Sequence, residues 1–421
     1  MFRSLRIRNY RMFAAGGAVS NTGTWLQRTA QDWLVLDLTD VPGGSGMGSA
    51  AALGTATALQ FLPMLLFGLF GGVLADRYPK RPILVTAQSL MAALALTIGV
   101  LTMTGTAQVW HVFVMAFLLG LISCVEVPTR QAFVVEMVGR RDLPNAIALN
   151  SSIFNLARVV GPALAGLLIS MLGGTGPIFL INALTFGGVI ASLIFMRKAE
   201  LHTVEPLPRA KGQLREGLRY VLEREELLMP ILLIAFVSMF AQSFSMSIAL
   251  MARDEFGAGA SSFGLASSTF AVGALVGALL AARRVRLSRK VLFAGALGFG
   301  LFQAATGLAP FYPAYLLLLI PTGIALITIN TAANASVQLA TSPEMRGRVM
   351  GIYMLVFTGG APLGAPLIGW LSELGGPRTG VVVSGVLVIV GTGLAVLLTR
   401  LIAGRARRTH PVTARVRHAV T

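Results

Sequence analysis

The decapeptide GVLADRYPKR, residues Gly72–Arg81, carries four charged side chains between two long apolar stretches. The stretch before it covers residues 49–74, and the stretch after it covers residues 82–104. Each is long enough for an α-helix to cross ~30 Å of hydrocarbon, which requires about 20 mostly apolar residues. The sequence therefore predicts two membrane-spanning helices joined by a short charged turn.

The same apolar pattern continues on both sides of this pair and predicts twelve membrane-spanning helices. Twelve spans in 421 residues leave about 35 residues for each helix and its loop, so we expect short connections and no large soluble domain. The first span is not a cleavable signal peptide, since it is too long and contains Asn21, Arg28 and Asp32. The expected spans are residues 12–37, 49–74, 82–104, 109–134, 147–171, 177–196, 229–251, 262–282, 290–309, 313–338, 349–374 and 379–402.

The composition also indicates a membrane protein. Hydrophobic residues make up 55% of the chain and charged residues only 12%, whereas about 25% of a soluble protein is charged. The mean hydropathy is +0.75. The single cysteine, Cys124, excludes a disulfide within the chain, and four scattered histidines show no zinc-binding spacing, so we expect no metal site.

The net charge of +17 is explained by topology rather than by nucleic-acid binding. An even number of spans puts both termini on one side of the membrane. Of the 34 Lys and Arg residues, 29 lie in segments on that side; Arg253 and Arg378 lie on the other side, and Arg28, Arg130 and Arg158 lie within spans. This asymmetry follows the positive-inside rule, so we expect cytoplasmic termini and contact with anionic lipid at the cytoplasmic face.

One inner connection, residues 197–228, is much longer than the others and divides the spans into six plus six. Its segment Gly212–Glu226, GQLREGLRYVLEREE, repeats apolar residues at helical spacing and predicts an amphipathic helix on the inner membrane surface. We expect a six-helix bundle at 1–196, this linker, a second six-helix bundle at 229–402 and a basic cytoplasmic tail at 403–421. The segments PTRQAFVVEMVGRRDLPNAIALN (128–150) and GPALAG (161–166) correspond to NASVQLATSPEMRGRVMGIY (334–353) and GAPLGAPLIG (360–369), which indicates a repeat.

The charged turn between the second and third spans resembles motif A of the major facilitator superfamily, Gly-x-Leu-Ala-Asp-Arg-x-Gly-Arg-Lys. Pro79 replaces the usual glycine, and the matching positions are Gly72, Asp76, Arg77, Lys80 and Arg81. Gly161 and Pro162 resemble the core of the antiporter motif. The first span and the passage EVPTRQAFVVEMVGRRDLPNAIALNSSIFNLARVVGPALAG are similar to the branch that contains the enterobactin exporter and related drug:proton antiporters.

This resemblance implies an all-α membrane protein with twelve transmembrane helices in two pseudo-symmetric six-helix bundles. It also implies efflux of a small amphipathic molecule, such as a drug, siderophore or metabolite, by alternating access in exchange for protons across a bacterial inner membrane. The proton gradient would be the energy source, and we expect no cofactor and a monomer. The alternative is uptake or facilitated transport of a small or lipid-like solute without proton antiport.

Other classes of function are less consistent with the sequence. A membrane enzyme would need an acid, base or nucleophile constellation at one interface, and the sequence contains none. No phosphate-binding loop motif is present, which argues against ATP-driven transport. A receptor or scaffold would be expected to carry a soluble domain, for which the short loops leave no room.

Ionisable side chains within the spans are costly and therefore mark candidate functional residues. Asn21, Trp25, Arg28 and Asp32 step by four residues along one face of the first helix, and Arg28 can pair with Asp32. Asp32 either takes up and releases the coupling proton, or forms a permanent ion pair or stays hydrated near the outer surface. These alternatives remain open from the sequence.

The fourth and fifth spans carry a second set of charges. Glu126 and Arg130 form another i,i+4 pair. By resemblance, Glu126 joins the motif A charges in a network that closes the inner gate, with a coupling proton on Glu126 as the alternative. Arg158 would complete that network or bind an anionic substrate. Asp76 would bind the start of the eleventh helix near residues 347–351 and latch the outward-facing state, or remain an ordinary solvated carboxylate.

The fold implied by the resemblance places the first, fourth, seventh and tenth helices around a central cavity. Aromatic and amide side chains on these helices suit a bulky, partly apolar ligand. Small residues four apart, such as Gly273 and Gly277, predict close packing of helices. The candidate cavity residues are Asn21, Trp25, Arg28, Phe240, Gln242, Phe244, Tyr315, Thr322, Asn330 and Asn334.

Overall fold

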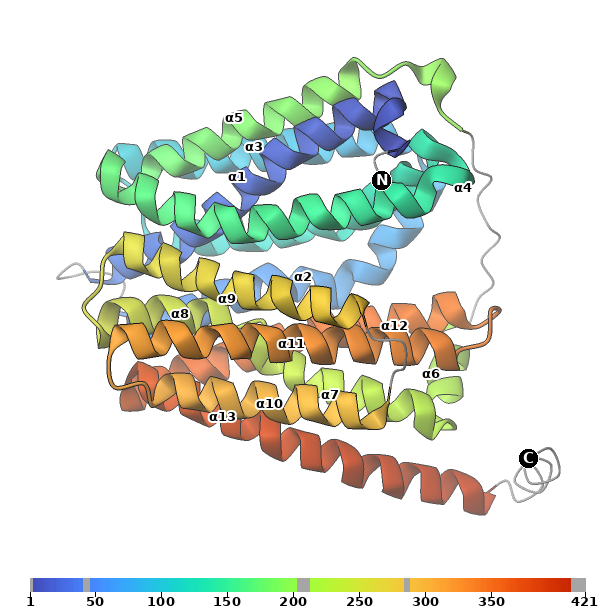
Figure 1. Ribbon diagram of the computed structural model, residues 1–421. Coiled ribbons are helices and arrows are strands. Elements are labelled where there is room, and N and C mark those ends of the chain that lie inside the picture. The colour runs from blue at the N-terminus through green and yellow to red at the C-terminus, as the bar shows by residue number, and fades with distance from the viewer. Residues whose placement is uncertain (1–2, 41–45, 203–212, 284–287, 410–421) are drawn as a thin grey trace.

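The computed structural model describes residues 3–40, 46–202, 213–283 and 288–409, and this part of the chain is helical apart from short turns (Figure 1). The predicted all-α fold is confirmed. In chain order the elements are η1 (Arg3–Arg6), α1 (Arg8–Thr39), α2 (Ser49–Arg77), α3 (Lys80–Met103), α4 (Val109–Leu172), α5 (Gly176–Ile194), η2 (Lys198–Glu200), α6 (Gln213–Leu222), α7 (Glu225–Ala241), α8 (Phe244–Leu250), η3 (Met251–Glu255), α9 (Ala260–Ala282), α10 (Arg289–Gly307), α11 (Tyr312–Ala340), α12 (Arg346–Gly359) and α13 (Ala361–Thr409).

Two of these elements are helical hairpins rather than single helices. Gly139 in α4 has φ 67° and Gly376 in α13 has φ 83°. Side chains with a Cβ avoid this left-handed region, so glycine lets the chain reverse at both positions. In the described residues, eight helical stretches are long and apolar enough to cross a membrane, and two of them contain these reversals. Together with α1 and α10, they are consistent with the twelve predicted spans.

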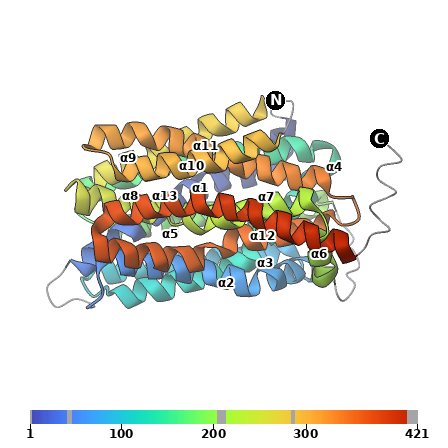
Figure 2. The same ribbon diagram turned by 90° about the horizontal axis from the view of Figure 1, so that it is seen from below.

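The helices form two bundles that lie side by side (Figures 1 and 2). The first half packs α1, α2, α3, α4 and α5 together, and the second packs α7, α9, α10, α11 and α13 together. The halves meet where α2 packs against α13 and α4 packs against α9. We call the end that holds η1, α6 and the end of α13 the linker end, and the other end, where α1 and α3 finish, the opposite end.

Large apolar side chains remain exposed around the perimeter of the bundles. Phe70 is 70% exposed, Leu184 78% and Leu339 77%. Exposing each of these side chains to water, rather than to an apolar environment, would cost roughly 1.5–3 kcal/mol. The perimeter is therefore suited to lipid, in agreement with the predicted membrane-spanning helices.

Glycines permit several of the close helix contacts that the spacing predicts. A Cβ added at Gly273 or Gly277 would meet the α11 backbone at Ile320 or Ile324, and one added at Gly360 would meet the Met239 backbone nitrogen at 2.8 Å. Backbones can approach this closely only where a side chain is missing.

The linker helix differs from the expected surface helix. It spans Gln213–Leu222 rather than Gly212–Glu226 and packs against α12 of the second half. Val221 is buried, Glu216 forms an ion pair with Arg348, and Leu218 remains 47% exposed. The helix is therefore docked on the second bundle. Residues 203–212 of the predicted linker and residues 410–421 of the predicted tail lie outside the described residues, while the first part of that tail continues α13 to Thr409.

Candidate functional site

A cavity of about 340 Å³ lies between the two halves. The first half supplies its charged groups, and the second half supplies much of its apolar wall. Its lining residues are Trp25, Arg28, Thr29, Gln31 and Asp32 from α1; Thr57, Gln60 and Phe61 from α2; Phe154, Arg158 and Pro162 from α4; Ser238, Ala241, Gln242, Phe244, Ser245 and Ile248 from the α7–α8 segment; Ser267, Phe270 and Ala271 from α9; and Leu326, Ile327, Asn330 and Phe357 from α11 and α12.

One wall of the cavity is a helix interruption that the sequence analysis did not predict. The expected span 229–251 stops at Ala241 and resumes at Phe244. Gln242 lies in the break and lines the cavity. Discontinuous helices at the middle of a membrane are typical of substrate sites, because interrupted helix ends expose polar backbone groups there.

Asp32 connects the halves across the cavity. Its Oδ2 accepts a hydrogen bond from Ser245 Oγ of α8 at 2.8 Å. Among the described residues, no ion pair within 4.0 Å joins Asp32 to Arg28, so the close pair predicted from the i,i+4 spacing is not formed. The Ser245 hydroxyl is the partner of Asp32 instead, because α8 packs against α1.

Both cavity arginines stack on aromatic rings. The Arg28 guanidinium carbon lies 5.3 Å from the centroid of the Trp25 ring and 5.8 Å from that of Phe61. The Arg158 guanidinium lies 5.8 Å from Trp25 and 5.7 Å from Phe270. Cation–π contacts of this kind lower the cost of burying a guanidinium.

Arg158 does not join the network predicted around Glu126. Its aromatic partners and its place in the cavity lining put it beside Arg28 instead. Glu126 lies 13 residues before the reversal at Gly139 and Arg158 lies 19 residues after it, so Arg158 is about 9 Å farther from the linker end. Of the two alternatives left open by the sequence, the geometry favours a ligand-facing Arg158.

Glu126 lies outside the cavity, within the first half. It is 3% exposed, and its Oε1 accepts hydrogen bonds from Gln88 Nε2 at 3.0 Å and from Arg130 Nε at 2.6 Å. A buried carboxylate with two donors, one of them charged, is satisfied and rigidly held. The network therefore ties α3 to α4.

The motif A residues lie at the linker end, where α2 finishes at Arg77 and α3 starts at Lys80. Lys80 Nζ forms an ion pair with Glu136 Oε1 at 2.7 Å, and Arg81 donates to the carbonyl of Ile194 at 2.7 Å. Arg77 is exposed, and Gly72 lies within α2. The side chain of Asp76 lies outside the described residues, so its predicted latch contact is not seen.

Five of the ten predicted cavity residues line the cavity, namely Trp25, Arg28, Gln242, Phe244 and Asn330. The other five do not, because helical spacing identifies a face but not a depth. Tyr315 precedes Asn330 by fifteen residues, or ~22 Å along α11, and packs against Phe256. Thr322 donates to the Leu318 carbonyl of its own helix, and Asn334 accepts a hydrogen bond from Gln338.

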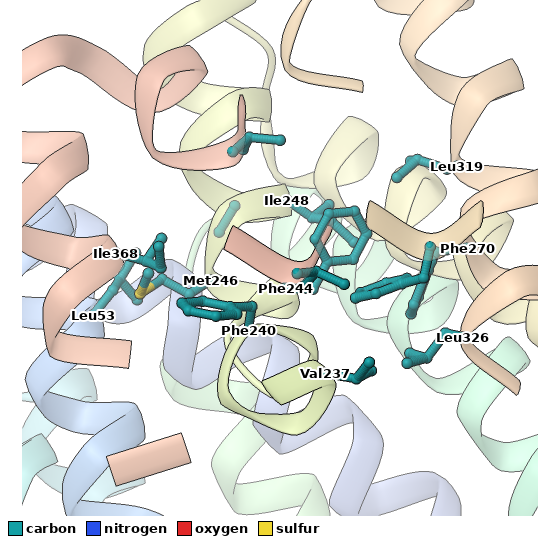
Figure 3. Packing of buried hydrophobic residues seen from close by; sticks show 14 of the residues in the cluster. Leu53, Val237, Phe240, Phe244, Met246, Ile248, Phe270, Leu319, Leu326 and Ile368 are labelled. Atoms are coloured by element: carbon teal, nitrogen blue, oxygen red, sulfur yellow. The ribbon is translucent and has the colours of Figure 1, made fainter. Parts of the chain in front are cut away.

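The remaining two residues miss the cavity for related reasons. Asn21 is one helical turn before Trp25, toward the linker end, and is not among the lining residues. Phe240 is buried with Met246, Leu53 and Ile368, whereas Phe244 packs against Phe270 with ring centroids 5.0 Å apart (Figure 3). Phe240 therefore belongs to the packing between α7 and its neighbours.

Gly161 and Pro162 connect the cavity to the contact between halves. Gly161 packs against Trp25, which leaves no room for a side chain at this position. Pro162 lines the cavity, and its carbonyl oxygen lies against Gly264 of α9. A shift of either half would therefore change the cavity wall directly.

The opposite end is closed by polar contacts between the halves. Arg253, beyond α8, binds Asp37 and Asp40 at the end of α1, each at 2.7 Å. Ser268 of α9 donates to the Val159 carbonyl of α4 at 2.7 Å. In the described part of the chain, the side-chain hydrogen bonds and ion pairs between residues 1–196 and residues 213–409 occur at this end, through Arg253, and at the level of the cavity, through Asp32–Ser245 and Ser268–Val159.

Several of these residues are not identified by the sequence pattern alone. Arg253 was noted only as one of two outer basic residues, although two acidic residues at the end of the first span, Asp37 and Asp40, were available as partners. Gln88 was visible as a lone amide in an apolar span. Ser245 carried no signal, because one serine in a helix usually bonds to its own backbone.

Two helical bundles around a central charged cavity are an arrangement typical of secondary transporters that are built from two six-helix repeats. A sequence model of transmembrane secretion effectors matches residues 1–417, so the chain belongs to this family of major facilitator superfamily transporters. Macrolide efflux protein A of Streptococcus pyogenes is 26% identical over 351 residues, which cover 81% of this chain and 86% of that protein. Multidrug efflux pump Tap of Mycobacterium tuberculosis is 27% identical over 392 residues, which cover 87% and 85%.

The fold is shared with solved transporter structures. One is a bacterial homologue of the human lysosomal transporter Spinster in an inward-facing, unoccupied conformation. It has a TM-score of 0.66, is 15% identical, and matches 95% of this chain and 98% of its own. At this identity the likeness shows the fold alone.

Proposed function

We propose that this protein is a proton-coupled exporter of a small amphipathic molecule in a bacterial inner membrane. The linker end faces the cytoplasm in this proposal, because 29 of the 34 basic residues fall on that side of the expected topology. The cavity is then closed toward the outside in the present structure. Export is the proposed direction because the names of two relatives, macrolide efflux protein A and multidrug efflux pump Tap, describe efflux.

The observation that carries the proton coupling is the bond between Asp32 and Ser245. A carboxylate in the cavity holds the two halves together through a charge-assisted hydrogen bond. Protonation of Asp32 removes the negative charge from the acceptor and weakens this bond. Proton binding would thereby change the free-energy difference between the two conformations, which is the requirement for coupling.

The cycle assigns separate tasks to the two ends. With Asp32 ionised and bonded to Ser245, the site is open to substrate from the linker end. Substrate binding and loss of the contacts at Arg253 would open the opposite end, where the substrate leaves and a proton reaches Asp32. The membrane potential acting on the positively charged empty site then returns the protonated protein, and the bond to Ser245 forms again when Asp32 releases its proton to the cytoplasm.

The linker end supplies the second gate in this proposal. Glu126 stabilises the arrangement of α3 and α4 next to the motif A turn, and it is the second candidate for a coupling proton. Asp76 would latch onto the start of α12 when this end closes. Gly347 and Gly351 lie in the first turns of α12, where this contact would form.

Partners and energy source follow from the same proposal. The proton gradient replaces ATP and no cofactor takes part. The basic linker end contacts anionic lipid, and a single chain encloses the whole cavity, so the working unit is a monomer.

The test is a comparison of a strain lacking this protein with its parent. Drug susceptibility and exported metabolites are measured in both strains, with and without an uncoupler that collapses the proton gradient. We expect the deletion strain to retain one or more compounds that the parent exports, and we expect the uncoupler to abolish the difference. A difference that persists without the gradient would favour facilitated transport instead.

A further inference from the structure

The cavity contains more positive than negative charge. Its lining includes the two guanidinium groups of Arg28 and Arg158 and the single carboxylate of Asp32, and the lining contains no other charged side chain. With Asp32 ionised, the lining therefore carries a net charge of +1. An organic cation would enter this site against electrostatic repulsion, and an anion would be attracted.

The hydrogen-bond donors of both arginines are free to bind a ligand. In the described part of the chain, neither Arg28 nor Arg158 donates a hydrogen bond or forms an ion pair within 4.0 Å to a protein group. Their contacts are with the faces of Trp25, Phe61 and Phe270. A guanidinium stacked on a ring keeps its N–H groups in the guanidinium plane, where they can bind a carboxylate or sulfonate through two parallel hydrogen bonds.

Trp25 brings the two arginines together. Its ring lies 5.3 Å from the Arg28 guanidinium and 5.8 Å from that of Arg158. Phe154 packs edge-on against the same ring with centroids 5.7 Å apart. Both guanidinium groups thus lie within 6 Å of the same ring centroid. Their like charges repel each other in a low-dielectric cavity, and a bound anion would reduce that repulsion.

The opposite wall belongs to the other half, carries no charged side chain and combines apolar side chains with serines and amides. Phe244, Phe270, Leu326 and Phe357 face the cavity, and the first three appear in Figure 3. The amide of Asn330 also lines it, and its Oδ1 has no hydrogen-bond partner. A ligand that spans the cavity would thus place an anionic group on the first half and an apolar body on the second.

From these contacts we propose that the substrates are amphipathic anions, in which an aromatic or aliphatic body carries a carboxylate or sulfonate bound by Arg28 and Arg158. This inference rests on the proposed transport function and names its substrate class. Charge balance fits the proposed exchange: with ionised Asp32 and a bound monoanion the cavity is neutral, which favours its occlusion from water. After release, the empty site is positively charged, and an inside-negative membrane potential draws that charge back toward the cytoplasm.

The experiment uses three probes of nearly equal size and different charge: 2-naphthoate, 2-naphthamide and 2-naphthylmethylammonium. Their binding to the full chain in lipid nanodiscs is measured by calorimetry. We expect 2-naphthoate to bind at least tenfold more tightly than 2-naphthamide, a difference of ~1.4 kcal/mol, and the ammonium compound to bind most weakly. Equal binding of all three probes, or tighter binding of the ammonium compound, overturns the proposal.

Variants assign the preference to the two arginines. Arg28→Gln and Arg158→Gln should each lose the preference for 2-naphthoate, whereas Arg158→Lys keeps the positive charge and should retain part of it. Arg219→Gln is the control, because it removes one positive charge from an exposed face of α6 outside the cavity. If Arg28→Gln and Arg158→Gln both fold, shown by a single thermal transition, and both bind like the wild type, the arginines do not form the site.

Transport is measured separately in proteoliposomes. Selective binding of 2-naphthoate without movement driven by a proton gradient would contradict the proposed function and leave the anion site in place. Gradient-driven movement of the ammonium compound in preference to 2-naphthoate would support a proton-coupled transporter and overturn the anion site.

Discussion

At the scale of single residues, Glu126 and Asp32 show how two carboxylates can occupy two different environments. Glu126 is buried within one half and has two donors, Gln88 and Arg130. Asp32 faces the cavity and has one donor, Ser245, from the other half. A change at Glu126 should therefore act on stability, and a change at Asp32 should act on the equilibrium between conformations.

Glu126→Gln keeps the shape of the side chain and removes its charge. The charge-assisted bond from Arg130 would be lost, and Arg130 would lack its carboxylate partner. We expect a loss of about 1.5–3 kcal/mol in the free energy of unfolding, measured as a lower thermal transition temperature of the purified protein.

Glu223→Gln is the matched control for Glu126→Gln. Glu223 also accepts a hydrogen bond from an arginine one helical turn away, but both partners are largely exposed on α6. Exposed pairs contribute little to stability, so the thermal transition temperature of Glu223→Gln should equal that of the wild type. The same transition temperature for both variants would show that the Glu126 network does not stabilise the fold.

At the scale of the elements, helix type and approximate bounds were predictable because long apolar stretches have few alternatives in a membrane. The expected first span, 12–37, lies within α1, and the turn between α2 and α3 falls in the quoted decapeptide. The interruption between α7 and α8 was not predictable, since no Pro or Gly marks Gln242 or Ser243. Next to it, Gly360 at the end of α12 and Gly364 of α13 lie against Met239 of α7.

The charged character of the candidate site was predictable from the sequence. The positions of its residues were predictable only in part. Polar and aromatic residues in the spans identified Trp25, Arg28 and Asn330, but the level of the cavity along each helix follows from how the two halves meet. Tyr315 illustrates this limit: it belongs to a central helix, yet it is fully buried near the opposite end beside Phe256.

The close contact of α4 with α9 gives a prediction for Gly264. A Cβ at this position would lie 3.0 Å from the Gly166 Cα and would also contact the Pro162 carbonyl oxygen. Gly264→Ala should therefore hold the two helices apart and favour the conformation that is open at the opposite end. Spin labels at positions 106 and 308, one on each half at that end, should show a longer mean distance.

Gly187→Ala is the control for this measurement, because a Cβ at Gly187 of α5 would meet nothing within 4 Å. The native Cys124 is buried and should not take up the label. An unchanged distance distribution in Gly264→Ala would mean that the α4–α9 contact does not control closure.

At the scale of the whole molecule, polar contacts join the two halves at the level of the cavity and at the opposite end. Arg253, with its two carboxylate partners on the other half, is the largest of these contacts. Its guanidinium also lies 5.4 Å from the Trp33 ring of α1. Closure of the opposite end therefore depends on a cation of the second half held by acidic and aromatic groups of the first.

Arg253→Gln should increase the fraction of molecules that are open at the opposite end. Each partly exposed ion pair contributes roughly 0.2–1 kcal/mol, so loss of both should change the ratio of conformations by about two- to thirtyfold. The same spin-label pair measures this ratio.

Arg378→Gln is the matched control for Arg253→Gln. Arg378 is the other basic residue outside the spans at this end, but its ion pair with Glu255, at 2.6 Å, lies within the second half. Arg378→Gln should therefore leave the distance distribution of the spin-label pair unchanged. Equal effects of the two variants would show that the ion pairs between the halves do not hold this end closed.

The central claim is that Asp32 couples proton movement to the conformational change. The most direct test is the simultaneous measurement of proton flux and substrate flux in proteoliposomes, for a compound that the deletion strain fails to export. In the wild type, an imposed proton gradient should drive that compound against its own gradient. In Asp32→Asn, gradient-driven accumulation and substrate-induced proton flux should both be lost, while binding and exchange at equal concentrations persist. Proton-coupled accumulation by Asp32→Asn at the wild-type rate would contradict the account.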